Sequence, residues 1–189
     1  NGDSHNHNDT GSITVYKDGK PFLIDIGVES YTKKTFSPQR YEIWTMQSAW
    51  HNLPTFDGVQ QLPGAEYAAQ NVQTTADSIT GELAGAYPPI EGLHSYRRTV
   101  SVREQGVQLS DCTDWPGTVE LTLLTEQQPV PTPDGLAVGT LGSIRFCPQA
   151  AKAEVTPVPV ADPRLRTAWP ETIYKITLRF KNTLKLELY

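Results

Sequence analysis

Three of the four histidines lie in two short stretches of the chain, residues 4–9 and 41–52. Histidine is the commonest metal ligand in proteins, and its ordinary pKa of about 6.5 also suits proton transfer. If the first stretch is extended, His5, His7 and Asp9 are spaced two apart and can converge on one face. These residue types therefore predict a metal site or a proton-transfer site near the beginning of the chain.

One aspartate, Asp25, interrupts the apolar run at residues 22–27. A buried carboxylate is costly unless it is paired or bound to a metal. His7, Asp25 and His51 form a plausible two-nitrogen, one-oxygen ligand set for zinc, with a fourth position open to water. The alternative is that the histidines are structural or exposed, and that Asp9 and the neighbouring asparagines only build a turn through side-chain to backbone bonds.

The segments that carry these residues begin with a predicted hairpin. Residues 11–17 alternate between apolar and polar, and an Asp18-Gly19 pair separates them from residues 20–26, which is a strong hairpin signal. Straight pairing across this turn sets Asp25 opposite Ser12. His7 then lies beyond the paired region, so the chain must bend near residues 8–11 for His7 to share a metal with Asp25.

The rest of the chain favours an all-β fold, an antiparallel β-sandwich of many short strands within a single domain of residues 1–189. Strands at this spacing, separated by turns rich in proline and glycine, are typical of sandwiches. Residues 41–50 are predicted to be mostly extended, although Ile43, Met46 and Trp50 would also fit one helical stripe. Residues 52–58 are predicted to form a loop, and residues 162–169 a helical turn. Further strands are expected at 68–74, 78–86, 95–104, 106–113, 118–125, 135–139, 142–147, 153–158, 172–180 and 184–188.

The amino-acid composition and net charge argue against some classes of function. The chain has 189 residues with 20% charged and 38% hydrophobic side chains, which fits a folded domain. The net charge of −5 gives no support to nucleic-acid binding. No apolar run approaches the roughly 20 residues of a membrane span. Arg97 and Arg98 alternate across a predicted strand, so at most one of them points to a given face, and a solvated face is the default expectation.

Two cysteines, Cys112 and Cys147, lie in segments predicted to be strands. Their spacing excludes a Cys-x-x-Cys redox motif or zinc knuckle. We predict two buried free thiols, with a cross-strand disulfide in an oxidising compartment as the alternative.

Three stretches together carry a family resemblance: HNHND at 5–9, LID at 23–25, and RYEIWTMQSAWHNLPTFDG at 40–58. They resemble the C-terminal domain of heparinase II/III-like polysaccharide lyases, and SYRR at 95–98 and DPRLR at 162–166 add weaker similarity. In this family a helical toroid precedes a β-sandwich, and the substrate lies between them. The toroid is absent here, so we expect a C-terminal part of a longer, periplasmic or secreted protein.

The resemblance also implies residue roles. It implies a zinc ion, mainly structural, held by His7, Asp25 and His51, and it places His5 in the active site. We expect Arg40, Tyr41 and Gln47 to contact an acidic polysaccharide, because arginine forks suit carboxylates.

The implied reaction is β-elimination at a uronic acid. A base removes the proton next to the carboxylate, and an acid protonates the leaving glycosidic oxygen. The chain alone, without the helical domain, is expected to be inactive. The alternative function is a non-catalytic carbohydrate-binding or structural module.

Overall fold

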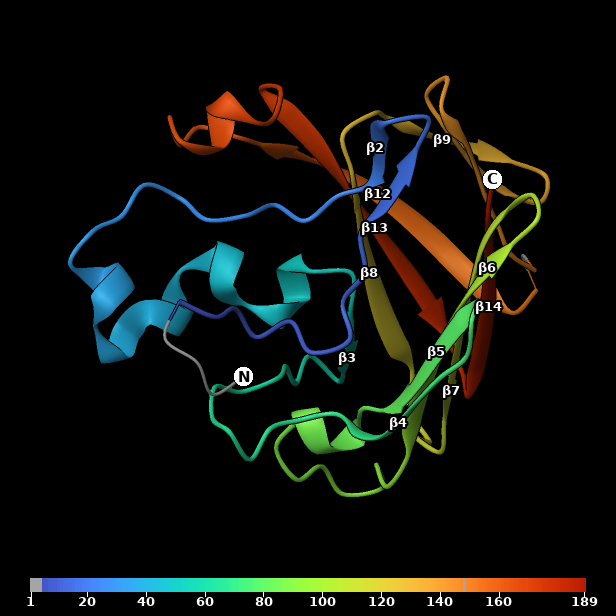
Figure 1. Ribbon diagram of the computed structural model, residues 1–189, viewed down its shortest axis with the longest axis horizontal. Helices are drawn as coiled ribbons and strands as arrows, with labels where there is room; N and C mark the ends of the chain where they lie inside the picture. The colour runs from blue at the N-terminus through green and yellow to red at the C-terminus, as the bar shows by residue number, and fades with distance from the viewer. Residues whose placement is uncertain (1–4, 148) are drawn as a thin grey trace.

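The computed structural model describes residues 5–147 and 149–189, and that part of the chain folds almost entirely into β structure (Figure 1). Its strands form a two-stranded hairpin, an eight-stranded sheet and a four-stranded sheet, and all paired neighbours are antiparallel. The predicted all-β sandwich is confirmed. The hairpin consists of β1 (Val15–Lys17) and β2 (Lys20–Leu23).

Each of the two large sheets runs in a spatial order that differs from the sequence order. The eight-stranded sheet contains, from edge to edge, β4 (Gln70–Thr74), β5 (Ser78–Glu82), β6 (Tyr96–Arg103), β7 (Gly106–Thr113), β14 (Thr183–Leu188), β11 (Gly142–Arg145), β10 (Gly135–Val138) and β9 (Pro129–Thr132). The four-stranded sheet contains β12 (Ala151–Pro159), β13 (Thr172–Phe180), β8 (Val119–Thr125) and β3 (Pro54–Phe56).

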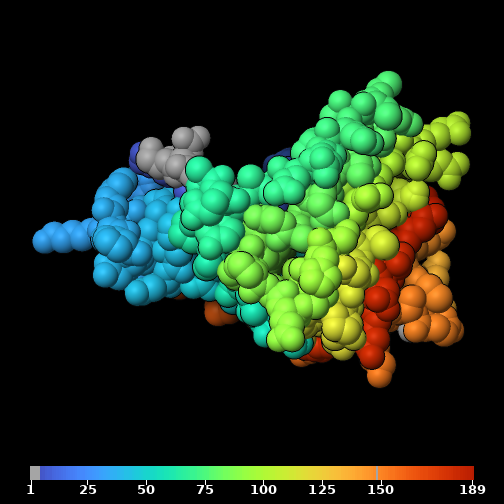
Figure 2. Space-filling model, turned by 90° about the horizontal axis from the view of Figure 1, so that it is seen from below, coloured from blue at the N-terminus to red at the C-terminus, as the bar shows by residue number. Residues whose placement is uncertain are grey.

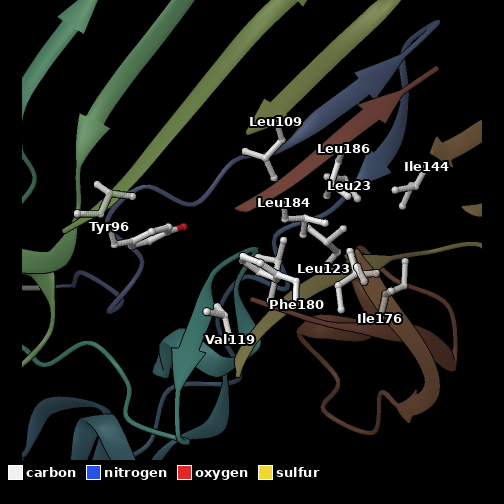
Figure 3. Packing of buried hydrophobic residues seen from close by; sticks show 14 of the residues in the cluster. Leu23, Tyr96, Leu109, Val119, Leu123, Ile144, Ile176, Phe180, Leu184 and Leu186 are labelled. Carbon is white, nitrogen blue, oxygen red and sulfur yellow. The ribbon is translucent and has the colours of Figure 1, made fainter. Parts of the chain in front are cut away.

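The main core lies between the two sheets (Figure 3). Leu109 and Leu186 face it from the eight-stranded sheet, and Leu123 and Ile176 face it from the four-stranded sheet, all with at most 1% exposure. Strand β8 is buried along nearly its whole length. The reason is that Leu123 packs into the main core, whereas Leu124 belongs to a second cluster with Ile24 and Ile26. The N-terminal part of the chain therefore covers the other face of β8.

The predicted Asp-Gly hairpin turn is present. Asp18 and Gly19 have positive φ angles of 51° and 74°, which the tight turn requires. A bulge between Val15 and Tyr16 shifts the pairing, so that Val15 lies opposite Leu23. A bulge places two residues of one strand opposite one of the other. The predicted straight register, with Asp25 opposite Ser12, is therefore wrong.

The segment 34–50 forms single helical turns, and the extended conformation predicted for residues 41–50 is wrong. The turns are the 3₁₀ elements η1 (Lys34–Phe36), η2 (Pro38–Glu42), η3 (Trp44–Met46) and η4 (Ser48–Trp50). Extended residues such as Ile43 and Gln47 separate them. Each turn satisfies its own backbone locally; for example, the His51 N–H donates to the Ser48 carbonyl at 3.2 Å. β-branched and aromatic content therefore did not indicate a strand here.

Strand β3 lies where a loop was expected, and β9 was not among the expected strands. β3 and β9 both contain proline and both lie at the edge of their sheets. A proline lacks the N–H that an inner strand needs, but an edge strand tolerates it. The predicted helical turn at 162–169 is confirmed as η6 (Leu165–Thr167). Among the described residues, no helix is long and apolar enough to cross a membrane.

Arg98 is almost fully buried, so the expectation of a solvated face is wrong for this residue, although Arg97 is exposed. Its guanidinium donates two hydrogen bonds of 2.8 Å to the Asp111 carboxylate on the neighbouring strand. A third nitrogen reaches the carbonyls of Gly11 and Asn52 at 2.9 and 2.6 Å. Arg98 thereby ties the sheet to the N-terminal segment and to the loop that follows His51.

We expect Arg98→Met to lower the free energy of unfolding by about 3–5 kcal/mol, because it leaves a buried carboxylate without its partner. Urea denaturation of the purified chain measures this. Arg179→Met is the matched control, since Arg179 pairs with Glu120 and Glu154 on the surface, where ion pairs contribute about 0–1 kcal/mol. Equal losses in the two variants would contradict the assignment.

Both cysteines are free and exposed, so their predicted burial is wrong and the disulfide alternative is not formed. Cys112 is in β7, and Cys147 follows β11. Strand β14 lies between β7 and β11, and it separates the two thiols.

We therefore expect both thiols to react with a thiol reagent in the native protein, without denaturant. Fewer than two reactive thiols per chain in denatured, non-reduced protein would indicate a bridge and contradict the structure.

Candidate metal and active site

Three segments that are distant in the sequence meet beside β8. They are the N-terminal residues 5–13, the stretch that follows β2, and the loop that follows η4. The 3₁₀ turns η1 to η4, drawn in light blue to cyan, lie toward one end of the molecule, away from the C-terminal strands drawn in red (Figure 2). The rings of His7 and His51 lie 5.1 Å apart between their centroids. The predicted bend at residues 8–11 is present, with Gly11 at a φ of 85° and the Ser12 N–H donating to the Asp9 carbonyl.

Two carboxylates flank this histidine pair. Nδ1 of His51 lies 2.8 Å from Oδ2 of Asp25. Among the described residues, the group whose possible ligand atoms all lie within 4.8 Å of one another is His7, Asp9 and His51, and the predicted ligand Asp25 is not part of it. Nε2 of His51 is buried and has no hydrogen-bond partner among the described residues. A buried polar atom without a partner is rare and points to an unseen ligand.

The electrostatics favour the protonation states that a metal requires. Burial raises the pKa of Asp25, but the hydrogen bond and charge of His51 and the Gly27 N–H together lower that pKa below its usual value. Burial, with help from the neighbouring His51, lowers the pKa of His7. At neutral pH Asp25 is thus ionised and His7 is neutral, which are the forms that bind metal ions.

His5 lies at the surface, next to this cluster in sequence. Its φ of 71° falls in the left-handed region, and its ring contacts the ring of Phe36 edge-on at 5.9 Å between centroids. Non-glycine residues adopt this region infrequently, although histidine does so more often than most. His5 is exposed, so its imidazole is accessible to a ligand.

Arg40, Tyr41 and Gln47, the predicted substrate contacts, all make hydrogen bonds within the chain. Arg40 donates to the Asn6 carbonyl through Nε and Nη2, at 3.2 and 2.9 Å. The Tyr41 hydroxyl donates to the Asn6 side chain at 2.7 Å, and Gln47 donates to the Tyr41 carbonyl. These three residues thus support the segment between His5 and His7. Their contact with substrate stays a prediction.

A buried glutamine, Gln61, fixes the same segment from the other side. Its side-chain amide both accepts from the Thr10 N–H and donates to the Thr10 carbonyl, each at 2.9 Å. Its backbone carbonyl accepts from the Asn8 side chain at 3.2 Å. The N-terminal segment is therefore held by specific polar contacts on both sides of His7.

The chain was compared with models of known protein families. The family model described as heparinase II/III-like, C-terminal, matches residues 1–119 of the 189. The chain belongs to this family. The matched residues contain both histidines of the cluster, both flanking carboxylates and His5.

Two solved structures share the heparinase III-like fold. One, described as the heparinase III BT4657 gene product, has a TM-score of 0.64 and 16% identity, and the match covers 100% of this chain and 31% of that one. The other, the same product with methylated lysines, has a TM-score of 0.60 and 14% identity, with 97% and 30% covered. At such identities the likeness shows the fold, and this chain spans under a third of those chains. No curated protein matches it.

The candidate site also depends on three residues that we did not predict from the sequence as site residues. Asn52, Gln61 and Arg98 join the segments that carry the site. Asn52 follows His51 directly within the 40–58 stretch, and Arg98 belongs to the SYRR stretch at 95–98, so both positions carried a signal from the family resemblance. Amide and arginine side chains are common on surfaces, and their burial here is a property of the tertiary structure.

Proposed function

We propose that this chain forms one wall of the active site of a polysaccharide lyase, which cleaves a uronic-acid-containing polysaccharide by β-elimination. The observation that supports this most is an exposed His5 two residues before His7 of the His7–His51–Asp25 cluster, in a heparinase II/III-like C-terminal domain. The acidic polysaccharide lies against His5, and a helical domain of the longer protein forms the opposing wall. We place that protein in the periplasm or outside the cell.

In the proposed reaction, a base removes the proton next to the uronate carboxylate. The electron pair forms the new C=C bond, and the bond to the glycosidic oxygen breaks while an acid protonates that oxygen. His5 holds or transfers a proton at this face, or stabilises the charge that develops on the carboxylate. Arg40 holds the backbone carbonyl of Asn6 and Tyr41 holds its side chain, so the His5 ring is presented from a fixed segment.

We further propose that His7, Asp25 and His51 bind one zinc ion, and that Asp9 lies close enough to supply a fourth ligand. Two imidazoles and two carboxylates are a donor set that zinc accepts. The unpartnered Nε2 of His51 fits such an ion, together with the possible ligand atoms of His7 and Asp9. Asp25 faces Nδ1 of the same ring through Oδ2 and accepts from the Gly27 N–H through Oδ1, so its coordination of the ion requires a shift of these contacts. When bound, zinc would chiefly cross-link the three segments that carry these residues, with a structural role.

The test of catalysis is His5→Ala in the longer protein. If His5 transfers a proton, we expect kcat to fall by about 10²–10⁴-fold, because that is the usual contribution of a positioned acid or base. The absorbance of the unsaturated product measures the rate, and thermal unfolding measures stability. His94→Ala, at another exposed histidine, is the control. A loss of stability alone would assign His5 to the support of the metal site.

A second candidate function is carbohydrate binding without catalysis. Tyr31 and Phe36 are 49% and 65% exposed, and their rings meet edge-on at 5.4 Å between centroids, beside His5. Arg164 stacks on Tyr31 at 4.5 Å. Exposed aromatic rings of this kind can pack against sugars. Binding of uronate oligosaccharides by the longer protein, with no product formed, would favour this alternative.

A further inference from the structure

We infer that Asn52 is the positioning residue of the site formed by His7, Asp25 and His51. This inference rests on the proposed function in taking that cluster as the working site. Asn52 follows His51 directly, and it is fully buried at 0% exposure. It contacts the segment that carries His7, the segment that carries Asp25, and strand β8.

The side-chain amide of Asn52 joins three backbone segments. Nδ2 donates to the carbonyls of Ile13 and Ile24, at 2.6 and 3.0 Å. Oδ1 accepts from the N–H of Leu124 in β8, at 2.8 Å. A neutral amide offers two donor hydrogens and an acceptor oxygen, and both ends of this amide are engaged. An aliphatic side chain of the same size could make none of these bonds.

The bond to Ile24 acts most directly on the site. The Ile24 carbonyl belongs to the peptide bond that leads into Asp25, and Asn52 is bonded to His51 through the chain. One hydrogen bond therefore fixes the backbone of Asp25 relative to that of His51. The 2.8 Å contact between the Asp25 carboxylate and Nδ1 of His51 depends on how far apart these two backbone segments lie. Partners that orient the ligating histidine commonly change metal affinity when they are lost.

The backbone of Asn52 is fixed as well. Its N–H donates to Oγ of Ser12 at 3.2 Å, on the segment that follows Asp9. Its carbonyl accepts from Arg98 at 2.6 Å, and the same Arg98 nitrogen donates to the Gly11 carbonyl. Arg98 is in turn held by Asp111. Arg98 thus anchors both the N-terminal segment and the His51 loop to the eight-stranded sheet.

The experiment compares Asn52→Asp and Asn52→Ala with Thr113→Val in this chain. Asn52→Asp keeps the shape and the acceptor but loses both donors. Thr113 is a matched control because it is buried and makes two hydrogen bonds to backbone, with Ser95 and Trp115. Cobalt(II) is titrated in, and its visible absorption reports affinity and ligand geometry. In the metal-free protein, proton NMR follows the Nδ1–H of His51 in its bond to Asp25.

We expect both Asn52 variants to bind cobalt at least about tenfold more weakly, with an altered absorption band and loss of the hydrogen-bonded Nδ1–H signal. Thr113→Val should lower the melting temperature and leave both signals unchanged. Unaltered affinity and an unaltered Nδ1–H signal in the folded Asn52 variants would overturn the inference. If the wild-type chain binds no cobalt, the metal proposal fails, and the NMR signal alone decides the role of Asn52.

If neither Asn52 variant folds, Ser12→Ala provides the comparison. It removes only the acceptor for the Asn52 N–H, and loss of one hydrogen bond predicts about two- to tenfold weaker cobalt binding. Affinity and spectrum equal to those of the wild type would then overturn the inference.

Discussion

His51→Ala is expected to reduce the zinc content of the purified chain from about one ion to almost none, because it removes the central ligand of the proposed set. His51 is the fully buried member, and it contacts both His7 and Asp25. Its loss therefore separates the remaining donors as well as removing a nitrogen. Elemental analysis after dialysis against zinc-free buffer measures the content.

Thermal unfolding gives a second measure of the same prediction. A metal that binds only the folded state adds about 2.7 kcal/mol of stability at one hundred times its Kd. Added zinc should therefore raise the melting temperature of the wild type and leave that of His51→Ala unchanged. His94→Ala should behave as the wild type, since His94 lies on the exposed surface. Equal zinc content in the two histidine variants would rule out the site.

Measurement of zinc content also shows which of the two carboxylates, Asp25 or Asp9, binds the ion directly. If Asp25 is a ligand, Asp25→Asn should abolish stoichiometric binding. If it only orients His51 through Nδ1, affinity should fall by about 10–100-fold while one ion still binds at saturation. Asp9→Asn is tested in the same way: loss of stoichiometric binding would make Asp9 a ligand, and unchanged zinc content would show that it is not one.

The isolated chain should form no unsaturated product from heparan sulfate, alginate or chondroitin. Elimination needs a base, an acid, a group that neutralises the uronate carboxylate, and a substrate held in register. Positioning alone can contribute roughly 7–11 kcal/mol to the rate, which corresponds to a factor of at least about 10⁵. This chain offers His5 at an exposed surface, without an opposing wall to hold the sugar or exclude water.

The comparison is between the chain and the longer protein at equal concentration, followed by absorbance of the C=C bond. The control is binding of zinc by the same preparation, which shows that the isolated chain is folded at its site. Turnover by the isolated chain at a rate near that of the longer protein would mean that the catalytic acid and base both lie within these residues.

The strands could be predicted from the sequence because their pattern depends on residues that are neighbours in the sequence. Residues 106–113 and 172–180 alternate and end at turn residues, and they form β7 and β13 with those bounds. The Asp18-Gly19 turn was equally local, since positive φ at both positions favours these residue types. The sequence also indicated the chemistry of the site, because few residue types other than histidine and aspartate bind zinc.

Local patterns were insufficient where distant contacts decide the structure. The bulge at Val15 and Tyr16 changed the register of Asp25, and 3₁₀ turns replaced the extended conformation predicted for residues 41–50. The burial of Arg98 follows from its partner Asp111 and from carbonyls 87 and 46 residues away. No local pattern encodes such pairings.

For the candidate site, too, the sequence and the tertiary structure decide different properties. The sequence determined which side chains can bind a metal or move a proton. The tertiary structure decided that Asp9 as well as Asp25 lies beside the histidine pair, that Arg40 is engaged with Asn6, and that Asn52 joins the segments. The physical reason is that a buried polar group must find a hydrogen-bond partner wherever the fold provides one, and only the packing of β8 against the N-terminal segments fixes where that partner is.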